Sequence, residues 1–325
     1  MKNLKELLFL KGIKGVGKVR IQKRYLPYLM EGTDLHELCE TVAREEKNLS
    51  DQDLSIALHK AEMLSDQIVH DSSVHVITMF DEDYPSRLHV MGDKKPLILY
   101  VKGNANALKA DAIAFVGTRN PSPWTQLVEK RLVSAVLNHH DVTVVSGLAL
   151  GCDGIAHQTT LTTGHKTVAV LPCGVHHVVP TSHVDLAEKI IESGGCLVSE
   201  YEPDAYATKS WFVERDSLIA AMADATVIME CGVKSGTMHA ANAALKFQRP
   251  VGCYLPDKPD RGDFSGNQLL IAEKNASALR NQVDLDMFLS IFHHEPETSQ
   301  EQNNPVNKEQ EKKQPQSVQL SLFDL

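Results

Sequence analysis

Two hydrophobic periodicities divide the chain. Over the first 70 residues, apolar side chains recur at the three- and four-residue spacing of amphipathic helices. From residue 111 to about 280, short apolar runs such as AIAFVG (112–117) and KTVAVLPCG (166–174) alternate with helix-like segments. Strands buried on both faces that alternate with helices form a doubly wound, mainly parallel sheet. We therefore predict an α/β core over residues 71–292, preceded by a small helical module over residues 1–70.

The helical module carries a local excess of positive charge. Between positions 11 and 24 it has six basic residues and no acidic one. A helix, the GxG turn at Gly15-Val16-Gly17 and a second helix are the layout of helix-hairpin-helix (SAM-like) modules, whose glycine amides approach a phosphate. Lys14, Lys18 and Arg20 are therefore predicted to form a DNA contact on this module, as a second site besides any on the α/β core. The alternative is a helical cap with a solvated basic face.

Composition and charge exclude several classes of protein. With 325 residues and 42% hydrophobic content, the chain is long enough for a folded core. No apolar run reaches the roughly 18 residues of a membrane helix, so we expect a cytoplasmic protein with no membrane contact. The six cysteines are scattered without a CxxC pair, which predicts neither disulfides nor zinc, and no cofactor is expected. The net charge of −9 argues against a uniformly DNA-binding surface but permits a local basic patch.

Glycine-containing loops follow four of the predicted strands. Because the carboxyl ends of parallel strands meet at one edge, the loop amides and helix N-termini should converge on one crevice suited to an anion. SGLALGCDGIAH (146–157) fits three interpretations: a dinucleotide loop, a hydrolase site or a cradle for a nucleic-acid backbone. No GxGxxG fingerprint and no GxxxxGK[ST] motif occurs, so dinucleotide and Walker-type ATP sites have little support. The four loops span residues 116–122, 146–157, 172–180 and 230–241.

Several polar residues of these loops allow both a structural and a chemical role. Asp153 and His157 stand four apart at a predicted helix start, where capping and packing are favoured over catalysis. Glu230 ends a strand and is either a general base or an acceptor for loop amides. Ser235-Gly236-Thr237 has the form of a helix N-terminus that binds phosphate. Arg119, directly after a glycine turn, suits bidentate phosphate recognition.

Taken in order, these segments resemble the DNA-processing protein DprA (Smf) family. The resemblance covers residues 1 to about 280. It implies an extended Rossmann fold that binds single-stranded DNA in the strand-end crevice without catalysis, helps to load the RecA recombinase, and often forms a homodimer. The matching motifs are GTR (117–119), SGLALGCDGIAH (146–157), KSWFVERDSLIAAMA (209–223) and ECGVKSGTMHAANAA (230–244).

The resemblance assigns DNA contacts to Arg119, Lys209, Phe212 and Arg215. Cations neutralise phosphates, and an aromatic ring lets a base stack. The sequence departs from the family at Leu150, where an arginine is usual, and at Asp216-Ser217, which replace an asparagine and an arginine. Each departure should weaken DNA binding. The complete expected site consists of Gly117, Arg119, Ser146, Gly147, Gly174, Lys209, Phe212, Arg215, Ser235, Gly236 and Thr237.

The C-terminal region carries a different signal. Residues 293–318 are rich in Glu, Gln, Asn, Lys and Pro, which predicts a disordered linker. QLSLF (319–323), within the apolar segment 319–325, resembles the peptide by which bacterial proteins bind the DNA polymerase sliding clamp, and a disordered leash would set its effective concentration. The alternative is a segment that folds back on its own domain. The expected anchors are Gln319, Leu320, Leu322 and Phe323.

Two other function classes remain open at the level of sequence. One is a nucleotide-binding enzyme or sensor similar to phosphoribohydrolases, in which the Ser235-Gly236-Thr237 turn would bind a nucleotide and Glu230 would act on its N-glycosidic bond. The other is a scaffold with a degenerate crevice, whose tail alone acts. Binding of oligonucleotides and release of free base distinguish these classes from a DNA-binding protein.

Overall fold

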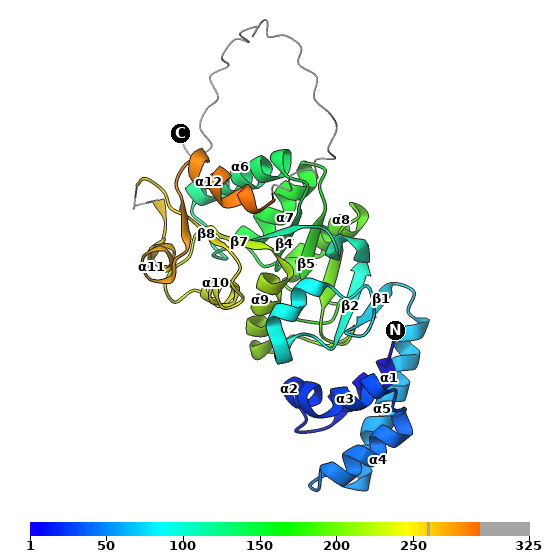
Figure 1. Ribbon diagram of the computed structural model, residues 1–325. Coiled ribbons are helices and arrows are strands. Elements are labelled where there is room, and N and C mark those ends of the chain that lie inside the picture. The colour runs from blue at the N-terminus through cyan, green and yellow to red at the C-terminus, as the bar shows by residue number, and fades with distance from the viewer. Residues whose placement is uncertain (259–260, 293–325) are drawn as a thin grey trace, which may run out of the picture.

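A nine-stranded sheet forms the centre of the computed structural model, which describes residues 1–258 and 261–292 (Figure 1). Its strand order is β1-β2-β6-β5-β4-β3-β7-β8-β9. Only β2 runs antiparallel to its neighbours β1 and β6; the remaining pairs are parallel, which confirms the predicted mainly parallel α/β class. The strands are β1 (Val74–Thr78), β2 (Ile98–Gly103), β3 (Ala112–Val116), β4 (Thr143–Ser146), β5 (Thr167–Val170), β6 (Cys196–Ser199), β7 (Ala225–Ile228), β8 (Val251–Tyr254) and β9 (Ser277–Leu279).

The order of the strands creates a switch point between β3 and β7. From β3 the chain builds β4, β5 and β6 outward to one side, then returns to place β7, β8 and β9 on the other side of β3. The connections that leave the carboxyl ends of β3 and β7 therefore run to opposite faces of the sheet, to α6 (Pro123–His139) and α10 (Thr237–Lys246) respectively. In doubly wound sheets this divergence opens a crevice outside the carboxyl ends of the strands, where ligands bind.

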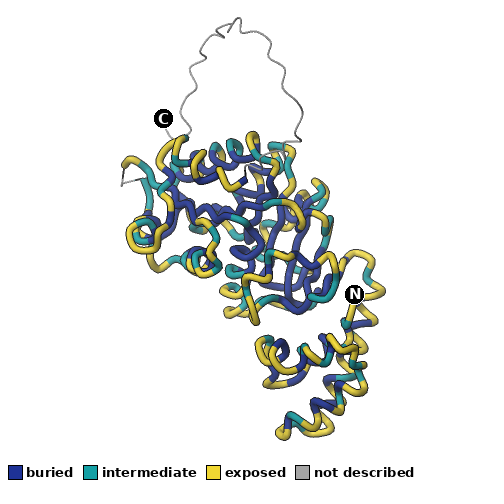
Figure 2. The backbone as a smooth tube through the Cα atoms, viewed as in Figure 1, coloured by how far each residue is buried: buried dark blue, intermediate teal, exposed yellow. Residues whose placement is uncertain are grey.

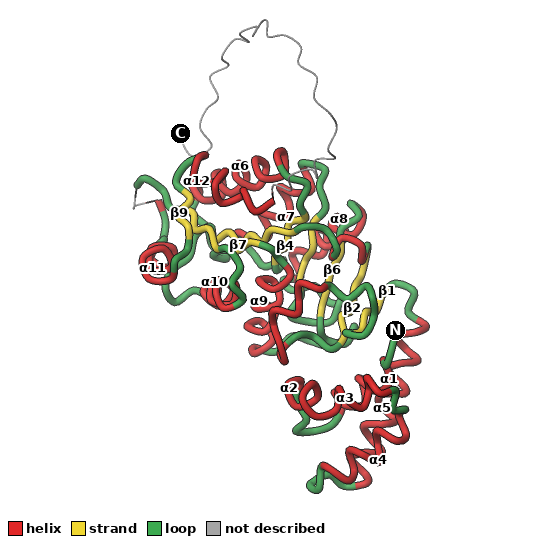
Figure 3. Tube along the Cα trace, in the orientation of Figure 1, coloured by secondary structure: helices red, strands yellow, loops and turns green. Residues whose placement is uncertain are grey.

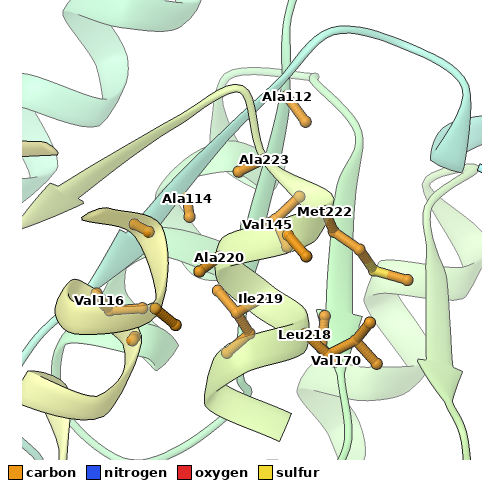
Figure 4. Packing of buried hydrophobic residues seen from close by; sticks show 14 of the residues in the cluster. Ala112, Ala114, Val116, Val145, Val170, Leu218, Ile219, Ala220, Met222 and Ala223 are labelled. Atoms are coloured by element: carbon orange, nitrogen blue, oxygen red, sulfur yellow. The ribbon is translucent and has the colours of Figure 1, made fainter. Parts of the chain in front are cut away.

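Helices cover both faces of the sheet, and its strands are buried between them (Figures 2 and 3). Figure 4 shows α9 on one face, where Leu218, Ile219 and Met222 pack towards Val145 and Val170 of the strands. Alanines on α9 and α10 let these two helices approach each other and the sheet closely. The opposite face is covered by α6 and α12, which pack on β3 and β7. The helices of the core are α6 (Pro123–His139), α7 (Cys152–Thr162), α8 (Val184–Glu192), α9 (Lys209–Met222), α10 (Thr237–Lys246), α11 (Ser265–Lys274) and α12 (Gln282–Leu289).

The N-terminal helices form a module with its own apolar centre, which is continuous with the edge of the sheet at β1 and β2. Phe9 and Tyr25 of the module share one buried cluster with Ile98 and Tyr100 of β2. In the described residues no helix combines the length and apolar character needed to cross a bilayer. The elements are α1 (Leu4–Gly12), α2 (Lys18–Arg20), the π-helical turn η1 (Ile21–Tyr25), α3 (Leu26–Glu31), α4 (Leu35–Glu45) and α5 (Asp51–His70).

Between the first two strands the structure differs from the sequence pattern. The segment HVITMFDEDYPSRL looks β-rich, but only its first part pairs as a strand, and the 3-10 helix η2 (Ser86–Lys94) follows. Pro85 sets its start, because proline fixes φ and donates no hydrogen bond to a sheet. Shorter 3-10 helices are η3 (Ala105–Leu108), η4 (Thr181–His183) and η6 (Ser290–Phe292).

Candidate functional site

A pocket of 370 Å³ lies at the switch point between β3 and β7. Its walls come from the loops that follow β3, β4 and β7 and from α9, so the fold brings together segments that are far apart in the sequence. Six of the eleven expected contact residues line it: Gly117, Arg119, Arg215, Ser235, Gly236 and Thr237. The other lining residues are Val116, Thr118, Ala149, Asp153, Asp216, Ile219 and Ala240.

Arg119 and Phe212 form a cation–π pair at the mouth of this pocket. The Arg119 guanidinium carbon lies 5.7 Å from the centroid of the Phe212 ring. Arg119 is exposed, and the half-buried Phe212 lies on the first turn of α9. Lys209, the first residue of α9, is also exposed and lies three positions before Phe212, so both can occupy one side of the helix. Two cations and a ring are thus available to solvent beside the pocket.

The turn before α10 presents backbone to the same pocket. The Thr237 N–H donates to Ser235 Oγ over 3.2 Å, and Ser235 Oγ lies 3.1 Å from Thr237 Oγ1. Gly236 at the N-cap has no side-chain cap and is exposed; a Cβ placed on it would meet no atom within 4 Å. Amides at an open helix N-terminus attract anions. The N–H groups of Ser235, Met238 and His239 also donate to carbonyls of this segment. Among the described residues, the Gly236 N–H is thus the amide of this turn that is left for a phosphate oxygen, and the phosphate contact stays a prediction.

Arg215, to which the resemblance assigns a DNA contact, is buried in the wall of the pocket. It is only 4% exposed, with Nη1 3.6 Å from Asp153 Oδ2 and Nε 3.2 Å from Asp216 Oδ1. Neither contact has hydrogen-bond geometry, and among the described residues Nε and Nη1 have no hydrogen-bond partner. The guanidinium thus lies in the wall of the pocket as one member of a buried charge cluster. It can act on an anion in the pocket mainly through its charge.

The carboxylates of this cluster change the electrostatics of the pocket. Burial raises the pKa of Asp216 to about 6, and it also raises the pKa of Asp153, which is opposed by the Arg215 charge. With both acids ionised, the two arginines and two aspartates that line the pocket sum to zero charge. The asparagine expected at position 216 would leave one positive charge. Asp216 therefore makes the pocket less attractive to phosphate at neutral pH.

Four of the expected contact residues pack against the protein. Ser146 is buried, and its Oγ donates to the Phe115 carbonyl over 2.7 Å. A Cβ on Gly147 would lie 1.3 Å from Arg215 Nη1, and one on Gly174 would lie 2.1 Å from the Glu202 carbonyl oxygen. At Gly117 a Cβ would overlap the Cys152 side chain. These glycines permit close approach of protein segments, and at Gly117 and Gly147 this approach shapes the wall of the pocket.

Glu230 has the structural role that the sequence analysis left open. Its Oε2 accepts hydrogen bonds from the Ser122 N–H at 2.9 Å and Thr125 Oγ1 at 2.7 Å, and Oε1 accepts from the Asp263 N–H at 3.2 Å. It is buried and does not line the pocket. Its carboxylate holds three loop segments together, which leaves it poorly placed for proton transfer to a ligand.

His157 and Asp153 also hold the structure together. The His157 ring is fully buried, with Nδ1 2.7 Å from Thr167 Oγ1, and burial lowers its pKa to about 3. Asp153 accepts from the Ala149 N–H at 3.3 Å, which fixes the loop before α7. Packing, one of the roles favoured from the sequence, describes His157. Asp153 is not a helix cap, because the N-cap of α7 is Gly151 and this helix has no side-chain cap.

The cations of the N-terminal module mostly face carboxylates. Lys18 pairs with Glu200 of the loop after β6, and Arg20 Nη2 lies 2.8 Å from Glu46 Oε2. Lys14 is exposed, and its charge contributes to the lowered pKa of Asp53. Of the three residues predicted as a second DNA contact, two are thus engaged within the chain, and the hypothesis stays a prediction that depends chiefly on Lys14.

Aromatic side chains on the same rim were not singled out by the sequence analysis. Tyr206 stacks on His177 with ring centroids 4.2 Å apart, and Tyr201 stacks on Trp211 at 3.8 Å. The only sequence signal was an enrichment of aromatics just before α9, and exposure cannot be read from it. The expected linker at 293–318 and the clamp anchors Gln319, Leu320, Leu322 and Phe323 lie outside the described residues.

Comparisons with known proteins agree with the arrangement of these motifs. Residues 75–290 match the family model of the DNA recombination-mediator protein A. Protein Smf of Escherichia coli is 34% identical over 177 residues, 54% of this chain and 47% of that protein, so the chain spans about half the length of that relative.

Two solved structures share the fold. DprA from Streptococcus pneumoniae matches 90% of this chain and 98% of that chain, with a TM-score of 0.76 and 24% identity. DprA from Helicobacter pylori is described for its single-stranded DNA binding mode. It matches 68% of this chain and 97% of that chain, with a TM-score of 0.60 and 28% identity. The family model covers most of the chain, including every segment that lines the pocket and all the strands except the first residue of β1. The chain therefore belongs to the DNA recombination-mediator protein A family, the DprA (Smf) family that its ordered motifs resemble.

Proposed function

We propose that this chain binds single-stranded DNA at the rim of the sheet, as a non-enzymatic mediator in DNA processing and recombination in the bacterial cytoplasm. The observation that carries the proposal is the Arg119–Phe212 pair beside the pocket at the switch point. The solved Helicobacter pylori relative, whose description names single-stranded DNA binding, supports the same ligand.

The chemistry of the rim suits an unpaired strand better than a duplex. A base can stack on the Phe212 ring only if no neighbouring base covers its face, which an unpaired strand allows. All bases have an aromatic face, so this contact does not depend on sequence. Arg119, over the ring, and Lys209, three residues before it on α9, are exposed cations that suit the neighbouring phosphates. The exposed Gly236 in the turn before α10 offers its N–H for a further phosphate oxygen, because the neighbouring Ser235 and Thr237 amides already donate within the chain. Binding without strong sequence preference follows from these contacts.

A nucleotide-cleaving enzyme is a weaker alternative. Glycosidic bond cleavage needs a general acid or base within reach of the ligand. Glu230 was the candidate, and its two carboxylate oxygens accept three hydrogen bonds from Ser122, Thr125 and Asp263 outside the pocket. Asp216, with a pKa near 6, is paired with Arg215. The contacts therefore favour binding over hydrolysis.

Three partner contacts complete the proposal. The captured strand would be passed to RecA, two copies of the chain would associate, and QLSLF at 319–323 would bind the sliding clamp. For the second copy, Val283, Met287 and Ile291 form an exposed apolar row at four-residue spacing on and just beyond α12. Met287→Glu should dissociate the dimer in light scattering. For the clamp, a peptide of residues 315–325 should bind, and the same peptide with Leu322→Ala and Phe323→Ala should not.

The main test is a titration of fluorescent oligo-dT and of a duplex of equal length, at low and moderate salt. We expect the single strand to bind more tightly, with affinity falling as salt rises. The double variant Arg119→Ala with Lys209→Ala should abolish most of this binding while the thermal melting curve stays unchanged, because both residues are exposed. Undiminished binding by that variant would instead favour a scaffold with an inactive crevice. Release of free base from adenosine monophosphate without oligonucleotide binding would favour the enzyme.

A further inference from the structure

Tyr206 is an aromatic side chain held in solvent. Its exposed fraction is 76%, the highest of any large apolar or aromatic side chain in the described residues. One face of its ring lies on His177, with ring centroids 4.2 Å apart and an angle of 27° between the planes. Tyr206 belongs to the loop between β6 and α9, and His177 to the loop after β5. Two loops thus combine to display one ring.

The two loops are joined by hydrogen bonds that fix the ring pair. The Gly174 N–H donates to the Ala205 carbonyl over 2.8 Å, and the His176 N–H donates to the Pro203 carbonyl over 3.0 Å. The His177 ring donates through Nε2 to the Asp204 carbonyl over 3.1 Å. The platform is therefore rigid before any ligand arrives, so little ordering entropy opposes binding.

A second stacked pair on the same rim shows what a purely structural contact looks like here. Tyr201 is buried, its ring lies 3.8 Å from that of Trp211, and its hydroxyl donates to Glu214 over 3.1 Å. Both rings of that pair are at least half covered, and the hydroxyl is satisfied. Tyr206 differs from that pair, since most of its side chain remains in water. Its exposure is not explained by packing.

Position along the rim links Tyr206 to the proposed DNA path. The loops after β5 and β6 lie on the same carboxyl edge as those after β3, β4 and β7, with strands about 4.8 Å apart. Tyr206, Lys209 and Phe212 follow one another at three-residue intervals, and six residues reach at most about 20 Å. Lys209 is exposed between the two aromatic positions. The Asp204 carboxylate in this loop is turned to His176, with Oδ1 2.8 Å from Nδ1.

We propose that Tyr206, backed by His177, is a second base-stacking platform, which holds a different nucleotide of the same single strand from the one on Phe212. The inference rests on the proposed function, because it needs a bound strand. An aromatic face stacks any base, so the platform adds affinity without sequence preference. It adds no charge, so it leaves the salt dependence unchanged. It acts only on strands long enough to reach both rings.

The test is the affinity of oligo-dT of increasing length, from about 4 to 16 nucleotides, for the full chain and its variants. In the parent, affinity should rise at the length where the second ring is reached. Tyr206→Ala should remove that rise and weaken the long oligonucleotides by about 5- to 150-fold, with the shortest unaffected and the salt slope unchanged. Tyr206→Phe should retain parental affinity, and Phe212→Ala should weaken all lengths.

Met30→Ala is the matched control, because Met30 is 73% exposed on α3, outside the rim. Its affinities should equal those of the parent. If Tyr206→Ala binds long strands as the parent does, or weakens all lengths equally, the second platform is refuted while DNA binding itself stands. If the parent binds no oligonucleotide, the proposed function fails and this inference fails with it.

Discussion

The guanidinium of Arg119 lies 5.7 Å from the ring centroid of Phe212, although the two residues come from different crossovers, one after β3 and the other on α9. The sheet order makes this possible, because the loop after β3 and the start of α9 both approach the rim. In the absence of DNA the cation stabilises the half-buried ring at the rim. Ring and cation contribute different terms to binding, and these terms can be separated experimentally.

Phe212→Ala should weaken oligo-dT binding by about 1 to 3 kcal/mol, because one base loses its stacking partner. The slope of log affinity against log salt should stay at the parental value, since no charge is removed. Fluorescence anisotropy at several salt concentrations measures both quantities. Phe212→Tyr keeps the ring and should bind as the parent does; a changed salt slope in Phe212→Ala would contradict the stacking role.

Arg119→Ala should change the salt dependence of DNA binding, which Phe212→Ala leaves unchanged. Loss of one phosphate contact should reduce the salt slope by about 0.7, as expected for single strands, and the affinity difference from the parent should shrink at high salt. Arg119→Lys should restore the slope, but only part of the affinity, because an ammonium lacks the planar fork that pairs with phosphate and stacks on a ring. An Arg119→Ala variant with the parental slope would mean that no phosphate is bound there.

The fold and the edge of the sheet that carries the site were accessible from the sequence. Apolar runs such as AIAFV at β3 alternate with helices, and that pattern requires a sheet covered on both faces. The strand-end position of Arg119 and of the Ser235-Gly236-Thr237 turn then placed them on one rim. The antiparallel insertion of β2 between β1 and β6 was not accessible, because pairing direction at a sheet edge leaves no periodicity in the sequence.

Some of the expected contact residues are exposed and others are buried, and their spacing in the sequence does not show which. Lys209 and Arg215 are both cations on α9, six residues apart, and look equivalent in the chain. Six residues turn a helix through about 600°, so the two side chains point in different directions. Lys209 is exposed, and Arg215 lies against Gly147 between two carboxylates. The exposure of Tyr206 likewise depends on how two loops join.

Arg215 should matter more for stability than for direct phosphate contact. Arg215→Ala leaves Asp153 and Asp216 buried without their cation and should lower the free energy of unfolding at pH 7 by about 3 to 5 kcal/mol. Gly147→Ala should also destabilise, since its Cβ would displace the guanidinium from Asp153. Urea unfolding measures both effects.

The pH dependence of that loss provides a check. Removing the cation favours protonation of the two acids, so part of the stability should return as the pH falls from 7 towards 5. Lys209→Ala is the control and should unfold like the parent at both pH values, because its side chain is exposed. An Arg215→Ala variant as stable as the parent would show that the charge cluster is not structural.

Asp216 should make DNA binding depend on pH. Its pKa in the folded protein is about 6, compared with about 3.9 in an unfolded chain. Between about pH 4 and 6 the Asp216 carboxyl is therefore more protonated in the folded state than in the unfolded chain. Its contribution to the free energy of unfolding falls as the pH rises through that range. Protonation removes a negative charge from the pocket wall, and oligo-dT affinity should rise as the pH falls from 7.5 to 5.5.

Asp216→Asn isolates this effect from other titrating groups. The variant should bind more tightly than the parent at pH 7.5, on the order of tenfold at low salt, and the difference should narrow at pH 5.5. Parallel anisotropy titrations of the two proteins give this ratio directly. A ratio that is constant with pH would assign the pH dependence to other groups.

Lys14 and Lys18 should separate two roles of the N-terminal module. Lys18 holds Glu200, which is only 7% exposed, and thereby links the module to the loop after β6. Lys18→Ala should lower the free energy of unfolding by about 1 to 3 kcal/mol, because it leaves a buried carboxylate without its partner. Lys14→Ala should leave stability unchanged, since Lys14 is exposed. If the module contacts DNA, Lys14→Ala should lower both the affinity and the salt slope for long oligonucleotides. Equal affinity of Lys14→Ala and the parent at every length would show that the basic segment serves to dock the module and that DNA binding is confined to the rim.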